Sequence, residues 1–298
     1  MYDVVIIGGG PAGLSAALVL GRSCRRVLVL DAGNPRNAPS PAAHSMFTRD
    51  GDTPQELLRI GREQLRPYDV ELRSAEATDV IREEGGFAIT LADSSRVSAR
   101  RVLLSTGVMD RLPEIEGVRD FWGTSVLHCP YCHGWEVRNE PVAVYANGET
   151  ALELAPLVLC WSRDVVLCTG GPAEFPTEER ERLERNGIVV REERVIRIEG
   201  KDGHLERIVF EDGTSLARSA MFLRTFPRQH SDLPEKVGCD FTSVGLVQVD
   251  SLGKTSVPGV YAAGDLALRI HQVIVAAADG AIAGIAINHD LMTSDLVE

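Results

Sequence analysis

The sequence has no excess of positive charge and few cysteines. The first shortage excludes a class of partners, and the second excludes a class of protein. Its 31 Lys and Arg residues stand against 43 Asp and Glu residues, which gives a net charge of −12. Nucleic acid and anionic membrane surfaces are therefore not expected as partners. The six cysteines fall at irregular spacing, so the chain is not a small secreted disulfide scaffold, and a cytoplasmic location is expected.

Signals for targeting and for metal binding are also missing. Residues 4–21 are almost continuously apolar, but four glycines and a proline precede Leu14 and no basic residue comes before the run. We therefore expect no signal peptide and no membrane span. The pair Cys129 and Cys132 is not followed by a second C-x-x-C or by an H-x3-5-H pair at ligand spacing, so no metal is expected.

The N-terminal segment has the pattern of a dinucleotide-binding β-α-β unit. A chain of 298 residues predicts about two domains, and the first opens with an apolar strand, the turn Gly8-Gly9-Gly10-Pro11-Ala12-Gly13, a helical run and a second strand that ends in Asp31. In such a G-x-G-x-x-G turn, Gly8 makes the bend, Gly10 lets a pyrophosphate approach and Gly13 lets the helix pack on the strand. The helix N-terminus faces the phosphates, and Asp31 binds a ribose hydroxyl. A glycine turn without a ligand is the alternative.

Three later segments are expected to contact the same dinucleotide. Residues 32–52 form a loop in which Arg36 and Asn37 follow the acidic residue closely, while His44 is more typical of a surface position. Ser105-Thr106-Gly107 follows a predicted strand at 102–104, and Gly264-Asp265 follows another near the C-terminus. The final helical run, about residues 272–291, is rich in Ala, Ile and Val, which favours a buried helix.

The centre of the chain carries Cys129-Pro130-Tyr131-Cys132. Two thiols at this spacing can close and reopen a small disulfide loop, which suits thiol–disulfide exchange. If Cys132 opens a helix, the helix dipole favours its thiolate. A permanent structural disulfide and a glutaredoxin-type motif are the alternatives. Cys160 and Cys168 lie in apolar surroundings and are expected in the core.

A second β-α-β pattern follows, but its fingerprint is damaged. The strand at 142–145 leads into Ala146-Asn147-Gly148-Glu149-Thr150-Ala151, in which Ala146 replaces the turn glycine. No Arg or Lys lies between Asp164 and Arg180 to hold a 2′-phosphate, and no acidic residue ends the strand at 165–168. These are key points of the motif, so we expect the fold without a competent nicotinamide site.

Together these motifs resemble the low-molecular-weight thioredoxin reductases, a family of FAD flavoproteins, over essentially the whole chain. The matching segments are 8–13, 105–107, the C-x-x-C with Gly134, and 255–265. The resemblance implies an α/β fold of two Rossmann-like nucleotide-binding domains and a homodimer. The FAD-binding domain, residues 1–113 and 241–298, is split by an inserted NAD(P)-binding-like domain, residues 114–240, which carries the C-x-x-C.

The resemblance also implies roles for individual residues. Cys132 would face the flavin ring, and Cys129 would exchange with the substrate. Residues 271–273 stand where the family has Arg-Gln-Ala. With the residues placed by the motifs above, the expected FAD contacts are Gly8, Gly10, Pro11, Ala12, Gly13, Asp31, Ala32, Arg36, Asn37, Thr106, Gly107, Gly264, Asp265, His271, Gln272 and Val273.

The sequence departs from the reductases directly after the second cysteine. They carry Cys-Ala-Thr-Cys-Asp, with the acid as proton donor, whereas His133 follows Cys132 here. A histidine with a pKa near ~6.5 can move protons in either direction and help to hold a thiolate; a histidine without catalytic duty is the alternative. With the damaged nicotinamide site, this resembles the FAD-dependent dithiol oxidases of gliotoxin and holomycin biosynthesis, which pass electrons from a dithiol through the cysteines and FAD to oxygen.

We therefore expect an FAD-dependent thiol–disulfide oxidoreductase with catalytic Cys129, Cys132 and His133. Its substrate is a small dithiol or a protein disulfide, its electron partner is oxygen or a reductant, and NADPH is not expected to serve. One alternative is a thioredoxin-disulfide reductase driven by NADPH or by another donor such as ferredoxin. A flavin-bound redox sensor with negligible turnover is the other.

Overall fold

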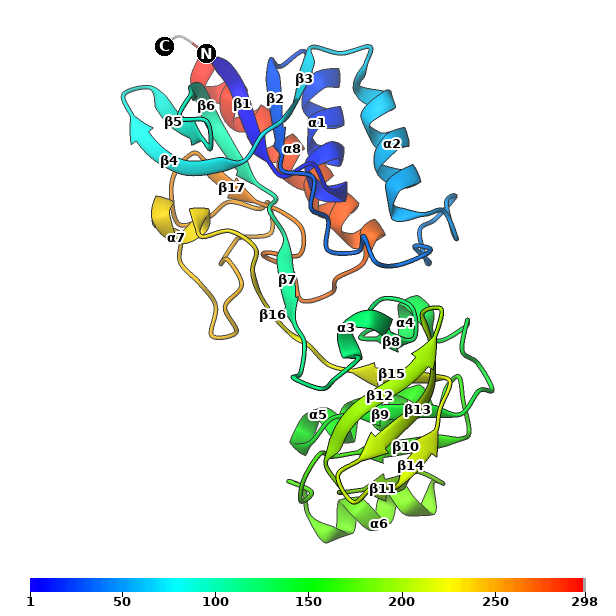
Figure 1. The fold of residues 1–298 in the computed structure, drawn as a ribbon. Coiled ribbons are helices and arrows are strands. Elements are labelled where there is room, and N and C mark those ends of the chain that lie inside the picture. Colours follow the sequence, from blue (N-terminus) through cyan, green and yellow to red (C-terminus); the bar gives the residue numbers. More distant parts are fainter. Residues whose placement is uncertain (297–298) are drawn as a thin grey trace. The chain divides into compact units, whose positions relative to one another are not determined.

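The chain folds into two compact units, which we describe separately. The computed structural model describes residues 1–296 (Figure 1). Unit 1 comprises Met1–Ala38, Ser45–Met109 and the chain from Pro227 onward; unit 2 comprises Pro39–His44 and Asp110–Phe226. Both units combine a largely parallel sheet with helices, so the predicted α/β fold class with Rossmann-like sheets is confirmed.

Unit 1 is built on a seven-stranded sheet of order β3-β2-β1-β6-β5-β4, with β17 paired to β6. The pairs β1–β2, β2–β3, β1–β6 and β6–β17 are parallel, while β4–β5 and β5–β6 are antiparallel. The elements are β1 (Tyr2–Ile7), α1 (Pro11–Arg22), β2 (Val27–Asp31), α2 (Pro54–Leu65), β3 (Val70–Ser74), β4 (Ala77–Glu83), β5 (Gly86–Leu91), β6 (Arg96–Leu104), α7 (Leu233–Val237), β17 (Val260–Ala262) and α8 (Val273–Asp295).

The central strand β1 is buried on both faces. Val4 and Ile6 belong to the apolar cluster beneath α1 and α8, whereas Val5 and Ile7 belong to the cluster on the opposite face. Such a continuous apolar run is what a parallel strand covered on both sides requires. The turn after β1 therefore follows a strand that is buried on both faces.

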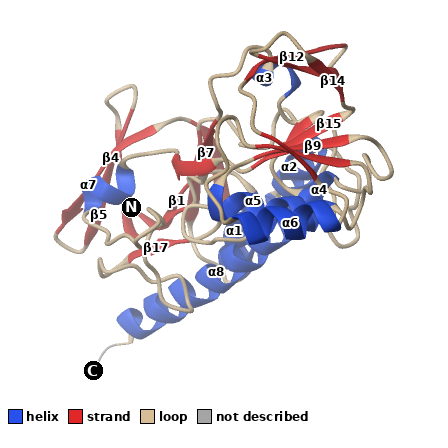
Figure 2. Ribbon diagram, turned by 90° about the horizontal axis from the view of Figure 1, so that it is seen from below, coloured by secondary structure: helices blue, strands red, loops and turns tan. Residues whose placement is uncertain are grey.

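Helix α8 packs closely on α1 because glycines line its contact face. A Cβ added at Gly280 would lie 2.0 Å from the carbonyl oxygen of Ala12, and one at Gly284 would lie 3.1 Å from that of Ala16. By length and composition α8 also qualifies as a membrane-spanning helix. Its residues Gly280, Ala283 and Ile287 are instead buried in the core beside α1, as in the core helix of a globular domain. Figure 2 shows α8 as the long helix that leads to the C-terminus.

Unit 2 contains the second nucleotide-fold sheet, of order β11-β10-β9-β15-β8, and an antiparallel sheet, β12-β13-β14. In the first sheet the strand pairs β11–β10, β10–β9, β9–β15 and β15–β8 are parallel. The elements are α3 (Val118–Phe121), β8 (Val126–Leu127), α4 (Pro130–His133), β9 (Val142–Tyr145), α5 (Gly148–Val158), β10 (Val165–Cys168), α6 (Thr177–Arg185), β11 (Val189–Arg191), β12 (Val195–Lys201), β13 (His204–Phe210), β14 (Ser215–Ala217) and β15 (Ala220–Leu223).

The chain passes between the units at more points than the expected domain limits at 113 and 240 suggest. Strands β7 (Val108–Arg111) and β16 (Phe226–Gln229) pair at two of the crossings. Residues 227–240 group with unit 1, because Leu233 and Cys239 are buried in its core cluster. The short segment 39–44, part of the expected cofactor loop, groups with unit 2.

The contact between α8 and α1 yields the first prediction. Gly280→Ala places a methyl group against the backbone of Ala12, and overpacking of this kind costs about 1–3 kcal/mol. We expect a lower midpoint of urea unfolding, followed by circular dichroism. Gly61→Ala is the matched control, because the nearest atom to its Cβ would be the movable Cδ1 of Leu14 at 3.0 Å and alanine favours a helix. Equal midpoints for the two variants would contradict this packing account.

Candidate functional site

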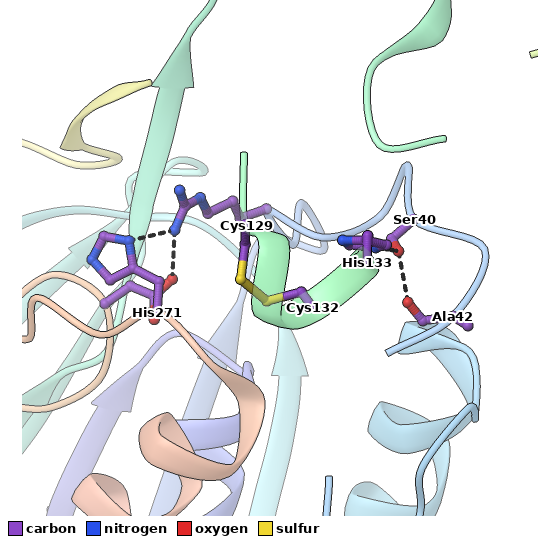
Figure 3. The surroundings of a disulfide bond; sticks show 8 residues. Ser40, Ala42, Cys129, Cys132, His133 and His271 are labelled. Carbon is purple, nitrogen blue, oxygen red and sulfur yellow. Dashed lines mark hydrogen bonds and ion pairs between the residues drawn. A yellow bond between two sulfur atoms is a disulfide. The ribbon is translucent and has the colours of Figure 1, made fainter. Parts of the chain in front are cut away.

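The central cysteines form a disulfide around a single helical turn. Cys129 is the N-cap of α4 with an extended backbone, and Pro130 occupies the first helical position, which its fixed φ favours. The amides of Cys132 and His133 both donate to the carbonyl of Cys129. This turn brings the two sulfurs together, and Cys129 and Cys132 are bonded (Figure 3).

The expected helix-dipole effect at Cys132 has no structural basis. Cys132 does not open a helix; it is the third residue of α4, which ends one residue later at His133. A macrodipole needs several aligned peptide units, and one turn does not supply them. Any stabilisation of a Cys132 thiolate must therefore come from side chains and from a bound cofactor.

The other cysteines lie apart from this pair and are not paired with one another. Cys168 is buried, and burial raises the pKa of its thiol to about 12, which makes it unreactive. Cys160 is exposed, so its expected core position is wrong. It lies just beyond the end of α5, where the chain turns at the surface. Among residues 1–296, no cluster of three or more His, Cys, Asp or Glu side chains is arranged to hold a metal ion.

His133 has a half-buried imidazole with one hydrogen-bonded nitrogen. Its Nε2 lies 3.0 Å from the hydroxyl of Ser40, and that hydroxyl donates to the carbonyl of Ala42 at 2.6 Å (Figure 3). Its Nδ1 is buried and finds no hydrogen-bond partner within the described part of the chain. The ring of His44 lies edge-on to His133 with centroids 6.4 Å apart, and His44 Nε2 lies 3.4 Å from Glu136 Oε1.

These surroundings favour the neutral form of His133. Burial lowers the pKa of His133 below its usual 6.5, and His44 acts in the same direction, while the carboxylate of Glu136 acts against them. The imidazole is thus a proton acceptor at neutral pH rather than a standing cation beside a thiolate. This direction weighs against the second role that the sequence allowed, in which a protonated His133 helps to hold a thiolate.

In unit 1, the turn between β1 and α1 is an open backbone cradle. Gly8 has φ +114°, and a Cβ there would lie 2.2 Å from the carbonyl oxygen of Ser105; a Cβ at Gly13 would lie 1.9 Å from that of Gly8. At Gly10 an added Cβ would meet no atom of residues 1–296 within 4 Å. Gly10 is the N-cap of α1, and the first turn carries no acidic residue. Free amides and a positive dipole end therefore face open space, which suits an anion such as a pyrophosphate.

The residues after β6 complete this cradle. The hydroxyl of Ser105 lies 3.1 Å from the carbonyl oxygen of Ile7 and 2.9 Å from that of Gly8, so its single proton can be donated to either and fixes the turn. The neighbouring hydroxyl of Thr106 is buried without a partner in the described residues, and Gly107 has φ +67°. An orphaned buried hydroxyl next to an open glycine turn is what a bound polar ligand would satisfy.

A second group of expected residues meets around Arg36. Its Nη1 lies 3.0 Å from Asp265 Oδ2 and 2.7 Å from His271 Nδ1, whose Nε2 lies 2.8 Å from the carbonyl oxygen of Leu268 (Figure 3). Because Arg36 can only donate, His271 Nδ1 accepts and Nε2 carries the proton. Gln272 is the N-cap of α8, and Val273 is its first residue.

The remaining expected contacts lie on either side of these groups. Asp31, at the end of β2, binds Arg62 at 2.8 Å and accepts from the amide of Gly33. Ala32 is exposed, and Asn37 is half-buried in the turn that follows. Pro11 and Ala12 begin α1, with Ala12 beneath Gly280.

Sequence reasoning missed Asp279, which holds one of the cofactor motifs in place. Gly264 has φ +91°, and its amide donates to Asp279 Oδ2 at 2.7 Å. Burial raises the pKa of Asp279. The available signal was an acidic residue inside an otherwise apolar helical run, where a buried carboxylate needs a donor.

The corresponding turn of unit 2 is closed by side chains. Asn147, the N-cap of α5, accepts from the amides of Gly148 at 2.9 Å and Glu174 at 2.8 Å, and it donates to the carbonyl of Pro172 at 2.9 Å. Glu149 lies in the first turn of α5. The Glu174 carboxylate comes within 3.9 Å of the Cβ position of Gly148. The helix start that a nucleotide would use is thus capped and negatively charged.

Comparisons with known proteins agree with these motifs. Residues 2–280 match the model of the pyridine nucleotide-disulphide oxidoreductase family. Thioredoxin reductase aclD of Aspergillus oryzae is 30% identical over 96% of this chain and 95% of its own. The crystal structure of a putative thioredoxin reductase TrxB from Bacillus anthracis has a TM-score of 0.95 and 32% identity, covering 99% of this chain and 100% of that one.

A further solved structure is similar over the same extent. The crystal structure of HlmI has a TM-score of 0.92 and 38% identity, and the match covers 99% of this chain and 93% of that one. The family implies FAD as cofactor, and the open cradle of unit 1 fits its pyrophosphate. The chain therefore belongs to the pyridine nucleotide-disulphide oxidoreductase family and is a thioredoxin reductase-like enzyme.

Proposed function

We propose that the protein is an FAD-dependent dithiol oxidase that works without NADPH and uses oxygen as its electron acceptor. The observation that carries the proposal is the contrast between the two nucleotide turns. The turn at Gly10 is open and free of acidic residues, whereas the turn at Asn147 is capped by a side chain and flanked by Glu149 and Glu174.

The residues of unit 1 would hold FAD, and unit 2 would supply the reactive thiols. Gly10 and the first amides of α1 would bind the pyrophosphate, Asp31 a ribose hydroxyl, and Thr106 and Asp265 further polar groups of the cofactor. When bound, FAD supplies the two-electron relay between thiols and oxygen.

The overall reaction balances without a nicotinamide. The substrate dithiol loses two protons and two electrons and gains a sulfur–sulfur bond. The Cys129–Cys132 bond opens as the pair accepts the two electrons and closes again as the pair passes them on. Dioxygen takes up two electrons and two protons and becomes hydrogen peroxide.

The unit 2 turn works against a dinucleotide in two ways. The amide of Gly148 already has Asn147 Oδ1 as its acceptor, so a phosphate would have to displace an existing hydrogen bond. Glu149 and Glu174 would repel the phosphates across a short distance. NADPH carries one phosphate more than NADH, so the same carboxylates would disfavour NADPH more strongly.

A thioredoxin reductase driven by NADPH or by another donor is the second candidate. It is favoured by the description of aclD, a relative 30% identical over 96% of this chain, as a thioredoxin reductase. The two candidates share the fold and the cysteine pair, so the electron donor separates them.

Assembly and location belong to the same proposal. The apolar side chains of Ile282, Ile285 and Met292 are exposed on α8, which supports a homodimer formed through an apolar surface. The irregular spacing of the six cysteines supports a cytoplasmic location.

The flavin site generates the next prediction. Asp265→Ala should weaken FAD binding by ~10–100-fold, because a hydrogen bond to a charged group is lost, and the ratio of flavin to protein absorbance should fall. Asp93→Ala is the control, since Asp93 is an exposed carboxylate of unit 1 that binds only Ser95 in the described structure. A colourless wild-type protein that takes up no added FAD would refute the flavoprotein assignment.

The closed turn of unit 2 predicts poor use of nicotinamides. On anaerobic mixing, NADPH and NADH should bleach the flavin at least ~100-fold more slowly than an ordinary turnover rate of ~10 s⁻¹. Dithiothreitol should bleach it readily, and dithionite shows that all of the flavin is reducible. Bleaching by NADPH near ~10 s⁻¹ would contradict the oxidase proposal and support an NADPH-driven reductase instead.

The cysteine pair should divide its work between the two thiols. In Cys129→Ser we expect the Cys132 thiolate to give a long-wavelength charge-transfer band with oxidised flavin that fades as pH falls through the thiol pKa. In Cys132→Ser the remaining Cys129 thiolate should attack the disulfide form of the substrate, one substrate sulfur leaving as a thiolate, and the mixed disulfide that accumulates is detected by mass. A purely structural disulfide instead predicts that both variants lose stability alike and that neither changes the flavin spectrum.

A further inference from the structure

The loop residue Ser40 belongs to the same unit as His133, although it lies 93 positions earlier in the chain. Residues 39–44 group with unit 2, and Pro39 lies so close to Gly123 that a Cβ there would be 2.8 Å from the proline side chain. The contact between Ser40 and His133 is therefore part of one compact body (Figure 3).

The hydroxyl of Ser40 can make only one kind of bond to the imidazole. A serine hydroxyl has a single proton, and Ser40 donates it to the carbonyl of Ala42 at 2.6 Å. Toward His133 Nε2, at 3.0 Å, the same oxygen can only accept. Nε2 must therefore carry the ring proton, and in the neutral imidazole the lone pair belongs to Nδ1.

The other ring nitrogen is left in an unusual state. His133 Nδ1 is buried and has no hydrogen-bond partner among the described residues. A buried acceptor without a donor is costly, and a role in chemistry is one explanation for keeping such a group. The imidazole immediately follows Cys132 in α4, so this lone pair belongs to the segment that carries the redox disulfide.

We propose that Ser40 is a positioning residue that fixes the Nε2–H tautomer of His133 and so makes Nδ1 the atom that takes the proton of an incoming substrate thiol. This inference rests on the proposed oxidation of a dithiol. It assigns the proton acceptor to one atom and gives a function to a loop segment that lies far from the cysteines in the sequence.

The proton transfer and the disulfide exchange balance within the site. The S–H bond of the substrate breaks, its electron pair stays on sulfur and its proton moves to Nδ1. The thiolate then forms a bond to one cysteine sulfur while the Cys129–Cys132 bond breaks, and the other cysteine leaves as a thiolate. No outside oxidant enters this step, because the disulfide is the electron acceptor.

Two titratable groups act on His133 from its surroundings. Glu136 follows it in the chain and favours the protonated ring, while His44 comes from the same loop as Ser40 and disfavours it. Burial is the larger influence and keeps the pKa of His133 below its usual 6.5. The base is neutral above this pKa, so the rate of thiol attack should rise with pH through a region below 6.5 and then be independent of His133.

The first test needs no variant and no turnover. In oxidised protein labelled with ¹⁵N-histidine, long-range ¹H–¹⁵N spectra should show His133 as the Nε2–H tautomer with a ring N–H protected from exchange. His133→Ala assigns the signal. A wild-type His133 that is Nδ1–H, or that is doubly protonated at pH 7, overturns the proposal.

The second test compares Ser40→Ala with Ser40→Thr, which keeps the hydroxyl. In Ser40→Ala the protected N–H signal should be lost, and anaerobic flavin reduction by dithiothreitol should slow roughly 3–10-fold, the effect of one hydrogen bond. Ser40→Thr should restore both. His133→Ala should slow the same step by ~10²–10⁴-fold and remove the acid limb of its pH profile.

The outcomes separate this inference from the proposed function. If Ser40→Ala keeps the protected N–H and the wild-type rate, the role of Ser40 is wrong, while the dithiol oxidase stands. If wild-type flavin is not reduced by a dithiol, the proposed function fails, and the ring has no substrate proton to accept. Loss of the N–H signal in Ser40→Thr as well as in Ser40→Ala would also count against the hydroxyl as the positioning group.

Discussion

The approach of α8 to α1 is the constraint on which the cofactor cradle depends. Gly280 lies against the carbonyl of Ala12, where no side chain fits. The carboxylate of the adjacent Asp279 accepts a hydrogen bond from the amide of Gly264. Two consecutive residues of a single helix therefore fix both the start of α1 and the Gly264-Asp265 motif, although these lie at opposite ends of the sequence. Ser105 completes the arrangement by holding the carbonyls of Ile7 and Gly8.

Two turns at equivalent places in the two nucleotide folds of this chain have opposite chemistry. In unit 1 the helix begins at a glycine with open space before it, and an anion can use its amides. In unit 2 Asn147 takes that role and also ties the loop at Pro172 and Glu174 to the helix. The local fold is kept because its strands are buried, whereas binding depends on a few exposed polar groups that can change without loss of the core. This separation of fold from site is what the proposed use of a reductase-like architecture by an oxidase requires.

Much of the fold and part of the site could be predicted from the sequence. Features set by neighbouring residues were predictable, whereas contacts between residues far apart in the sequence were not. The turn from Gly8 to Gly13 follows a local pattern, so its helix, strand and glycine roles were visible. Ser40 and His133 are in contact although 93 positions separate them in the sequence, and no local pattern predicts this contact. A C-x-x-C does not determine where a helix begins, and Cys132 is the third residue of α4 rather than its first. Apolar neighbours in the sequence do not determine burial either, and Cys160 is exposed.

The most direct test of the account is oxygen consumption by the purified flavoprotein with a dithiol and no nicotinamide. With dithiothreitol as substrate, we expect one dioxygen consumed and one hydrogen peroxide formed for each disulfide produced, with no increase when NADPH is added. The double variant Cys129→Ser/Cys132→Ser should abolish the uptake. Oxygen uptake that is absent without NADPH, or that persists in the double variant, would contradict a dithiol oxidase acting through this cysteine pair.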